Sequence, residues 1–253
     1  MFRKILCTLI SLILVSSVAI SAASITTVNS EEPHLVSVEN YPQVTDLDDL
    51  LALAMRQYEE RAVMRNNVHS LSNSESDEIV ATQVLQEASY SDGSIIRRVS
   101  NTALLLVDEN GEKISASDYR ANYHQTSGTW GAIYGSLEFC VDEMIGGAPT
   151  IRGIYVKAAT GYGGPYQTTM IRTGYHVVEE WVYERSTQTQ DFPNPRPAQV
   201  CQMNIQYKEW VQLNSAISTY AQGYAFFYNN QGTVDEYNGQ YVLVIDAEEY
   251  YKT

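Results

Sequence analysis

Six carboxylates lie on or beside segments that alternate apolar and polar residues, and they have the clearest catalytic potential in this chain. Glycoside hydrolysis requires two carboxyl groups that face one groove, about 5 Å apart in retaining enzymes and farther apart in inverting ones. Acids on the wet faces of sheets are also ordinary, so sequence spacing does not select a pair. The six acids are Glu138, Asp142, Glu179, Glu180, Glu184 and Glu209.

The aromatic residues point to binding rather than to chemistry. The chain has 19 tyrosines and five phenylalanines. A tyrosine has an apolar ring and a polar tip, which suits either a half-exposed sheet face or a surface that binds sugars or proteins. A glycine-rich loop at residues 161–164 is expected to border such a surface. The candidate binding residues are Trp130, Trp181, Trp210, Tyr162 and Tyr166.

The other reactive residue types form no recognisable constellation. The four histidines are dispersed, and neither histidines nor cysteines occur at the spacing of zinc ligands. No Gly-x-Ser-x-Gly sequence is present for a serine nucleophile. The glycine-rich stretches at residues 146–147 and 161–164 open no predicted helix, so they offer no phosphate site. We expect neither a metal nor a cofactor.

The first 23 residues have the layout of a secretory signal peptide. Arg3 and Lys4 precede an uncharged run over residues 5–20, and small residues follow. This run is shorter than the roughly 20 apolar residues that a membrane-spanning helix needs. We therefore expect cleavage after Ala22 or Ala23, a secreted or extracellular protein, and no membrane span after processing.

Two cysteines remain after such processing. Cys140 and Cys201 both lie in predicted strands, and in an oxidising compartment an even pair most simply forms a disulfide. Closing a loop of about 60 residues would contribute on the order of 4 kcal/mol in the chain-entropy model. The alternative is a pair of free, buried thiols.

The charge of the chain restricts its partners. Sixteen Lys and Arg residues stand against 30 Asp and Glu residues, so the formal net charge is −14. A chain this acidic repels phosphate backbones and anionic membrane surfaces, so we expect no nucleic-acid binding.

The segment after the signal peptide is predicted to contain one helix. Residues 24–43 are polar and predict a flexible leader. Thr45 is a suitable N-cap, and apolar residues then recur at helical spacing, which predicts an amphipathic helix over residues 46–64. Asn and Ser residues predict a polar linker over residues 66–78, which completes a helix-and-linker region at residues 44–78.

Residues 79–253 are predicted to form one antiparallel β domain. Asp92-Gly93 marks a β-hairpin between two alternating runs. Residues 78–88 would also suit a helix, but Thr82, Val84 and the turn favour a strand. Eight or so alternating strands predict a β-sandwich or barrel-like fold with one wet face on each sheet. The further strands are predicted at residues 129–141, 151–158, 168–185, 200–213, 219–228 and 240–246.

From these features we expect a secreted, non-enzymatic binding or interaction protein that acts at the cell surface or in the extracellular medium. Its expected partner is an extracellular glycan or protein. The alternative is a secreted glycoside hydrolase that uses paired carboxylates on a β-sandwich.

Overall fold

The chain divides into two compact units, Met1–His34 and Leu35–Thr253. The predicted signal peptide and its cleavage site lie outside the described residues. No helix in the described part of the chain combines the length and apolarity that a membrane crossing needs. The computed structural model describes residues 32–67, 78–108, 112–123, 133–160, 168–179, 183–192, 199–214, 219–229 and 240–247.

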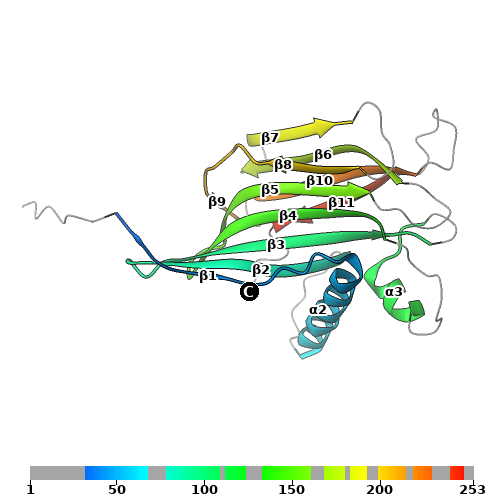
Figure 1. Cartoon of the computed structure of the whole chain (residues 1–253), viewed down its shortest axis with the longest axis horizontal. Helices are drawn as coiled ribbons and strands as arrows, with labels where there is room; N and C mark the ends of the chain where they lie inside the picture. The colour runs from blue at the N-terminus through cyan, green and yellow to red at the C-terminus, as the bar shows by residue number, and fades with distance from the viewer. Residues whose placement is uncertain are drawn as a thin grey trace, which may run out of the picture. The chain divides into compact units, whose positions relative to one another are not determined.

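Two antiparallel sheets form the second unit (Figure 1), which confirms the predicted mainly β, sandwich-like fold. The larger sheet has the order β1-β2-β3-β4-β5-β8, and β9 also pairs with β5. The smaller sheet has the order β11-β10-β6-β7. The strands are β1 (Leu35–Asn40), β2 (Ile79–Tyr90), β3 (Ile95–Leu106), β4 (Ile133–Ile145), β5 (Thr150–Thr160), β6 (Thr168–Glu179), β7 (Tyr183–Asp191), β8 (Val200–Asn204), β9 (Val211–Gln212), β10 (Tyr220–Asn229) and β11 (Gln240–Asp246).

The hairpin between β2 and β3 forms at the predicted turn, so residues 79–90 are a strand and not a helix. Gly93 has a φ of 84°, which glycine adopts without steric cost. The Asp92 carboxylate accepts hydrogen bonds from the backbone N–H and the hydroxyl of Ser94. This local chemistry fixes the turn and therefore the register of the two strands.

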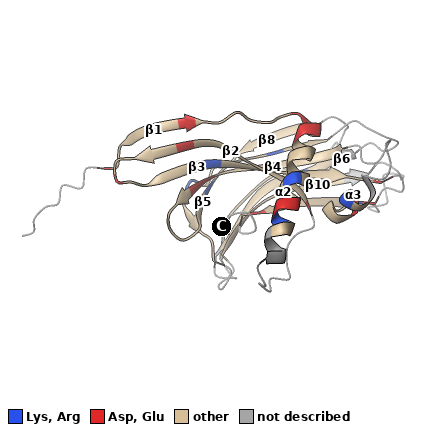
Figure 2. Ribbon diagram, turned by 90° about the horizontal axis from the view of Figure 1, so that it is seen from below, with Lys and Arg blue, Asp and Glu red and all other residues tan. Residues whose placement is uncertain are grey.

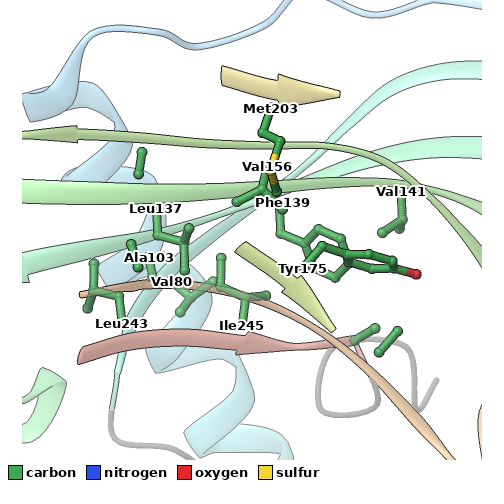
Figure 3. Packing of buried hydrophobic residues seen from close by; sticks show 14 of the residues in the cluster. Val80, Ala103, Leu137, Phe139, Val141, Val156, Tyr175, Met203, Leu243 and Ile245 are labelled. Carbon is green, nitrogen blue, oxygen red and sulfur yellow. The ribbon is translucent and has the colours of Figure 1, made fainter. Parts of the chain in front are cut away.

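The main core lies between the two sheets. Alternate residues of each strand point inward, and Figure 3 shows Phe139 of β4 packed beside Tyr175 of β6. The centroids of these two rings are 5.7 Å apart. Inward residues from β2, β3, β5, β8 and β11 complete the cluster, and Figure 3 labels Val80, Ala103, Val156, Met203, Leu243 and Ile245 among them.

A second apolar cluster lies on the other face of the larger sheet, beneath helix α2 (Leu47–Asn67) and helix α3 (Ala116–Tyr123). Leu50, Leu51 and Ala54 of α2 are buried in it. The inward residues Ala103 and Leu105 of β3 therefore alternate with residues that face this helical cluster. The sheet residues that contribute to the second cluster are Ile79, Ala81, Leu104 and Leu106.

The N-terminal part of the unit differs from its prediction in two details. The predicted leader contains a strand, because Leu35–Asn40 pair with β2 as β1. The carboxylate of Asp46, not the side chain of Thr45, caps α2 by accepting the backbone N–H groups of Asp48 and Asp49. The predicted helix over residues 46–64 is present as α2 (Leu47–Asn67), and its docking on the larger sheet was not predicted. Most of the predicted linker lies outside the described residues.

Three further segments differ from the predicted strands. The alternating run at residues 168–185 is two strands, β6 and β7, that pair with each other as a hairpin. The run at residues 200–213 is also interrupted, because residues 205–210 separate β8 from β9. Helix α3 was not predicted at all. The alternation of apolar and polar residues in the sequence continues across both breaks between strands, so the pattern alone does not show where a strand ends.

The predicted disulfide is wrong in this structure, since Cys140 and Cys201 are both free and buried. Cys201 on β8 faces the core between the sheets. Cys140 on β4 faces the opposite side, beside Tyr155. Strand β5 lies between the two cysteines, and their side chains point to opposite faces of the sheet, which a disulfide cannot bridge.

Candidate functional site

Two of the six candidate acids, Glu138 and Asp142, lie on the outer face of the larger sheet. The carboxylate of each accepts hydrogen bonds from neighbouring side chains. Asp142 is 2% exposed and accepts hydrogen bonds from Arg98 (2.8 and 3.2 Å) and Arg152 (2.8 Å). A buried carboxylate clamped by two guanidinium groups has a structural role in the sheet.

Glu138 is held in a similar way. One of its oxygens accepts the hydroxyl groups of Tyr155 at 2.6 Å and Ser100 at 2.8 Å, and the other lies 3.4 Å from the Lys157 ammonium. Glu138 and Asp142 are four residues apart on one strand, which places their Cα atoms about 13 Å apart at about 3.3 Å per residue. This arrangement does not resemble the carboxylate pair of a glycosidase.

The remaining candidate acids add no pair among the described side chains. Glu209 lies on the loop between β8 and β9 and accepts the hydroxyl of Tyr207 at 3.2 Å. The side chains of Glu179, Glu180 and Glu184 lie outside the described residues.

The environment of Cys140 makes it a poor nucleophile. Burial raises the pKa of its thiol from 9.0 to about 12, and the nearby Arg98 opposes only part of that effect. Burial and the hydrogen bond to Glu138 also raise the pKa of the neighbouring Tyr155. Because the thiolate is the reactive form of cysteine, this raised pKa leaves Cys140 largely in its thiol form at neutral pH.

Trp210 is the one predicted binding residue that the structure describes. It lies on the loop between β8 and β9, where the Arg152 guanidinium carbon is 4.8 Å from the centre of its ring. The ring is therefore used in a cation–π contact within the protein, in series with the Arg152–Asp142 ion pair. The candidates Trp130, Trp181, Tyr162 and Tyr166 lie outside the described residues.

Strand β10 carries aromatic residues on the face of the sheet that points away from the core. Large apolar side chains more commonly face the core, as apolar periodicity assumes. Up to Phe226, the small residues Ala221, Gly223 and Ala225 face the core, while Tyr220, Tyr224 and Phe226 point outward. The register then shifts between Phe226 and Phe227, and Phe227 is buried in the core. A Cβ atom on Gly223 would lie 2.9 Å from Cγ of Phe139, so the large ring from β4 occupies the space that the small residues leave. We call the outward residues Tyr220, Tyr224 and Phe226, together with His176 of β6, the aromatic strip.

A glycine shapes the centre of the aromatic strip. Gly174 of β6 pairs directly with Tyr224. A Cβ atom on Gly174 would lie 2.5 Å from Cζ of Tyr224, so the tyrosine ring lies across the backbone of the glycine. Phe226 meets this ring edge-on, with centroids 5.6 Å apart and an interplanar angle of 80°. In this position the Tyr224 side chain is half-buried.

Polar groups flank the aromatic strip on both neighbouring strands. Arg172 of β6 pairs with Asp191 of β7, and both side chains are exposed. On the other side, the amide of Gln222 donates to the Asp246 carboxylate at 3.0 Å. His176 and Tyr220 stack edge to face at one end, with centroids 6.1 Å apart. The strip thus combines half-buried rings with hydrogen-bonding groups on a sheet face opposite the core.

The sequence predicted a strand at residues 219–228, which is β10, but it did not identify the aromatic residues of this strand as candidate binding residues. The signal was present in the alternation of Tyr220, Tyr224 and Phe226 with Ala, Gly and Ala. Apolar periodicity assigns the larger side chains to the core, and only the position of Phe139 reverses that assignment. Within the described part of the chain, no three His, Cys, Asp or Glu residues are grouped as a metal site would require.

Comparison with known proteins adds nothing to this site, because no family model, curated protein or solved structure matches the chain.

Proposed function

We propose that this is a secreted, non-enzymatic binding protein that binds a neutral extracellular glycan through the aromatic strip. The signal-peptide pattern of residues 1–23 supports secretion. The observation that carries the glycan proposal is the outward orientation of Tyr220, Tyr224 and Phe226, which alternate with the small core-facing residues Ala221, Gly223 and Ala225.

The chemistry of the aromatic strip suits sugars. The negatively charged face of an aromatic ring attracts the C–H groups on the apolar face of a pyranose, in the same way as it attracts the positive edge of another ring. The flanking groups of Gln222, Asp246 and the Arg172–Asp191 pair supply donors and acceptors for sugar hydroxyls. This combination of apolar platform and polar margin is typical of a binding surface.

Charge favours a neutral glycan over an acidic one. The chain carries a formal net charge of −14, which repels a polyanion over the whole surface. Arg172, the basic residue beside the strip, is already neutralised by Asp191. An uncharged polysaccharide is not repelled by the net charge of the chain, and it does not need a free basic residue beside the strip.

The test is affinity electrophoresis of the processed protein in gels that contain neutral polysaccharides, followed by titration of the oligosaccharide that retards it. Tyr224→Ala removes the central aromatic ring and should weaken binding at least tenfold, which corresponds to a loss of about 1.4 kcal/mol or more of binding free energy.

Tyr90→Ala is the matched control, because Tyr90 is a half-buried tyrosine at the end of β2 on the other sheet. Its affinity should equal that of the unmodified protein. Equal affinity of the Tyr224→Ala variant, or preferential binding of a polyanionic glycan, would contradict the proposal.

A further inference from the structure

Strand β1 forms a free edge of the larger sheet, remote from the aromatic strip. It pairs only with β2 among the described residues, at one end of the strand order (Figure 1). All six of its residues are exposed. A strand at a sheet edge presents unpaired N–H and C=O groups on its outer side, which is a template for another strand.

The side chains of β1 do not protect this edge in the usual way. Lysine and proline are characteristic of protected edge strands, whereas β1 has neither and carries Glu39 as its one charged residue. Leu35, Val36 and Val38 are 53%, 63% and 43% exposed. The register of β1 against β2 shifts between Leu35 and Ser37, so the regular edge is the segment Ser37–Asn40.

One face of this edge continues an apolar row across the sheet. Val38 lies opposite Ala88, Ala88 lies opposite Ile96, and Ile96 lies opposite Met144, which is itself 39% exposed. An apolar side chain on an added strand would lie next to Val38 and extend the row.

The other face ends in an unbalanced row of charges. Glu39 lies opposite Glu87, and Glu87 lies opposite Arg97, which forms ion pairs with Glu87 (3.2 Å) and Glu143 (3.3 Å). Figure 2 shows the acidic bands of β1 and β2 beside a basic band of β3. Like charges directly opposite each other destabilise a sheet, and among the described residues no cationic side chain lies opposite Glu39 in this row.

We propose that the free edge of β1 binds an extended segment of a partner protein in which apolar and basic residues alternate. The segment adds to the sheet as a further strand, with an apolar residue beside Val38 and a lysine or arginine beside Glu39. Backbone hydrogen bonds supply affinity, and the alternating side chains supply specificity. The net charge of −14 opposes a second copy of this chain at the same edge.

The test uses the processed protein and a fluorescent peptide in which lysine alternates with valine, with binding measured by anisotropy. The unmodified protein should bind this peptide, and Glu39→Lys should weaken binding at least tenfold. The same variant should bind a peptide in which glutamate replaces lysine, which the unmodified protein should not bind. Glu60→Lys makes the same charge change on the exposed side of α2 and should leave both affinities unchanged.

A second peptide distinguishes strand addition from simple charge attraction. N-methylation at alternate residues removes the backbone donors of one edge while keeping every side-chain charge, so it should abolish binding. Equal binding of the methylated peptide, no binding of the unmethylated one, or a dimer of the unmodified protein that Val38→Asp dissociates would overturn the proposal.

Discussion

At the scale of single residues, two glycines determine where aromatic side chains pack. Gly223 leaves room for Phe139 inside the core, and Gly174 lets Tyr224 lie across the sheet outside it. Both glycines were visible in the sequence, but their partners come from other strands. Contacts between strands that are distant in sequence are therefore the part of the site that the sequence alone did not predict.

The substitution Gly223→Ala should destabilise the protein by about 1–3 kcal/mol, because the added methyl group would lie 2.9 Å from Cγ of Phe139 in a close-packed core. Urea unfolding followed by circular dichroism measures the change. Gly147→Ala is the matched control, since nothing lies within 4 Å of a Cβ atom there. If the Gly223→Ala variant were as stable as this control, the side chains around Phe139 would be able to move aside without loss of stability, which would contradict the prediction.

At the scale of elements, local chemistry explains what the sequence predicted and what it did not. The Asp92-Gly93 turn and the apolar stripe of α2 are local signals, and both elements formed as expected. The break between β6 and β7 has no such signal, because alternation of side chains is compatible with one long strand or with a hairpin. The break becomes evident only in the structure, where Glu179 at the end of β6 pairs with Tyr183 at the start of β7.

Helix α2 should contribute to stability through one face only. Leu50 is 5% exposed and lies against the larger sheet, so Leu50→Ala should cost about 2–5 kcal/mol of unfolding free energy. Leu47 is 38% exposed at the start of the same helix, and Leu47→Ala should cost far less. Thermal or urea unfolding of the two variants side by side makes the comparison, and equal losses would mean that α2 is not docked as described.

At the scale of the whole molecule, stability comes from two apolar layers rather than from a covalent link. The larger sheet is buried between the smaller sheet on one side and the helices on the other, at the level of β2 and β3. The sequence predicted the sandwich-like class because alternation and length suffice for that inference. It did not predict that the two cysteines face opposite sides, because the sequence does not show which face of a strand is inside.

The protein without residues 1–23 should therefore retain two thiols. Its intact mass should be the same with and without reductant, and both Cys140 and Cys201 should react with a maleimide only after unfolding in urea, since both are buried. A mass increase on reduction in the purified monomer would contradict the placement of the cysteines on opposite faces of the sheet.

The double burial of β3 implies a gradient of local opening across the larger sheet. Leu105 is buried between the two sheets, and its neighbour Leu104 is buried beneath the helices. Local opening of the helices or of the smaller sheet therefore exposes only one face of β3. Amide hydrogens at the centre of β3 should exchange with solvent only through global unfolding, whereas those of β1 should exchange through inexpensive local fluctuations. The edge at which we propose that another strand binds is thus also expected to open more readily than the centre of the sheet.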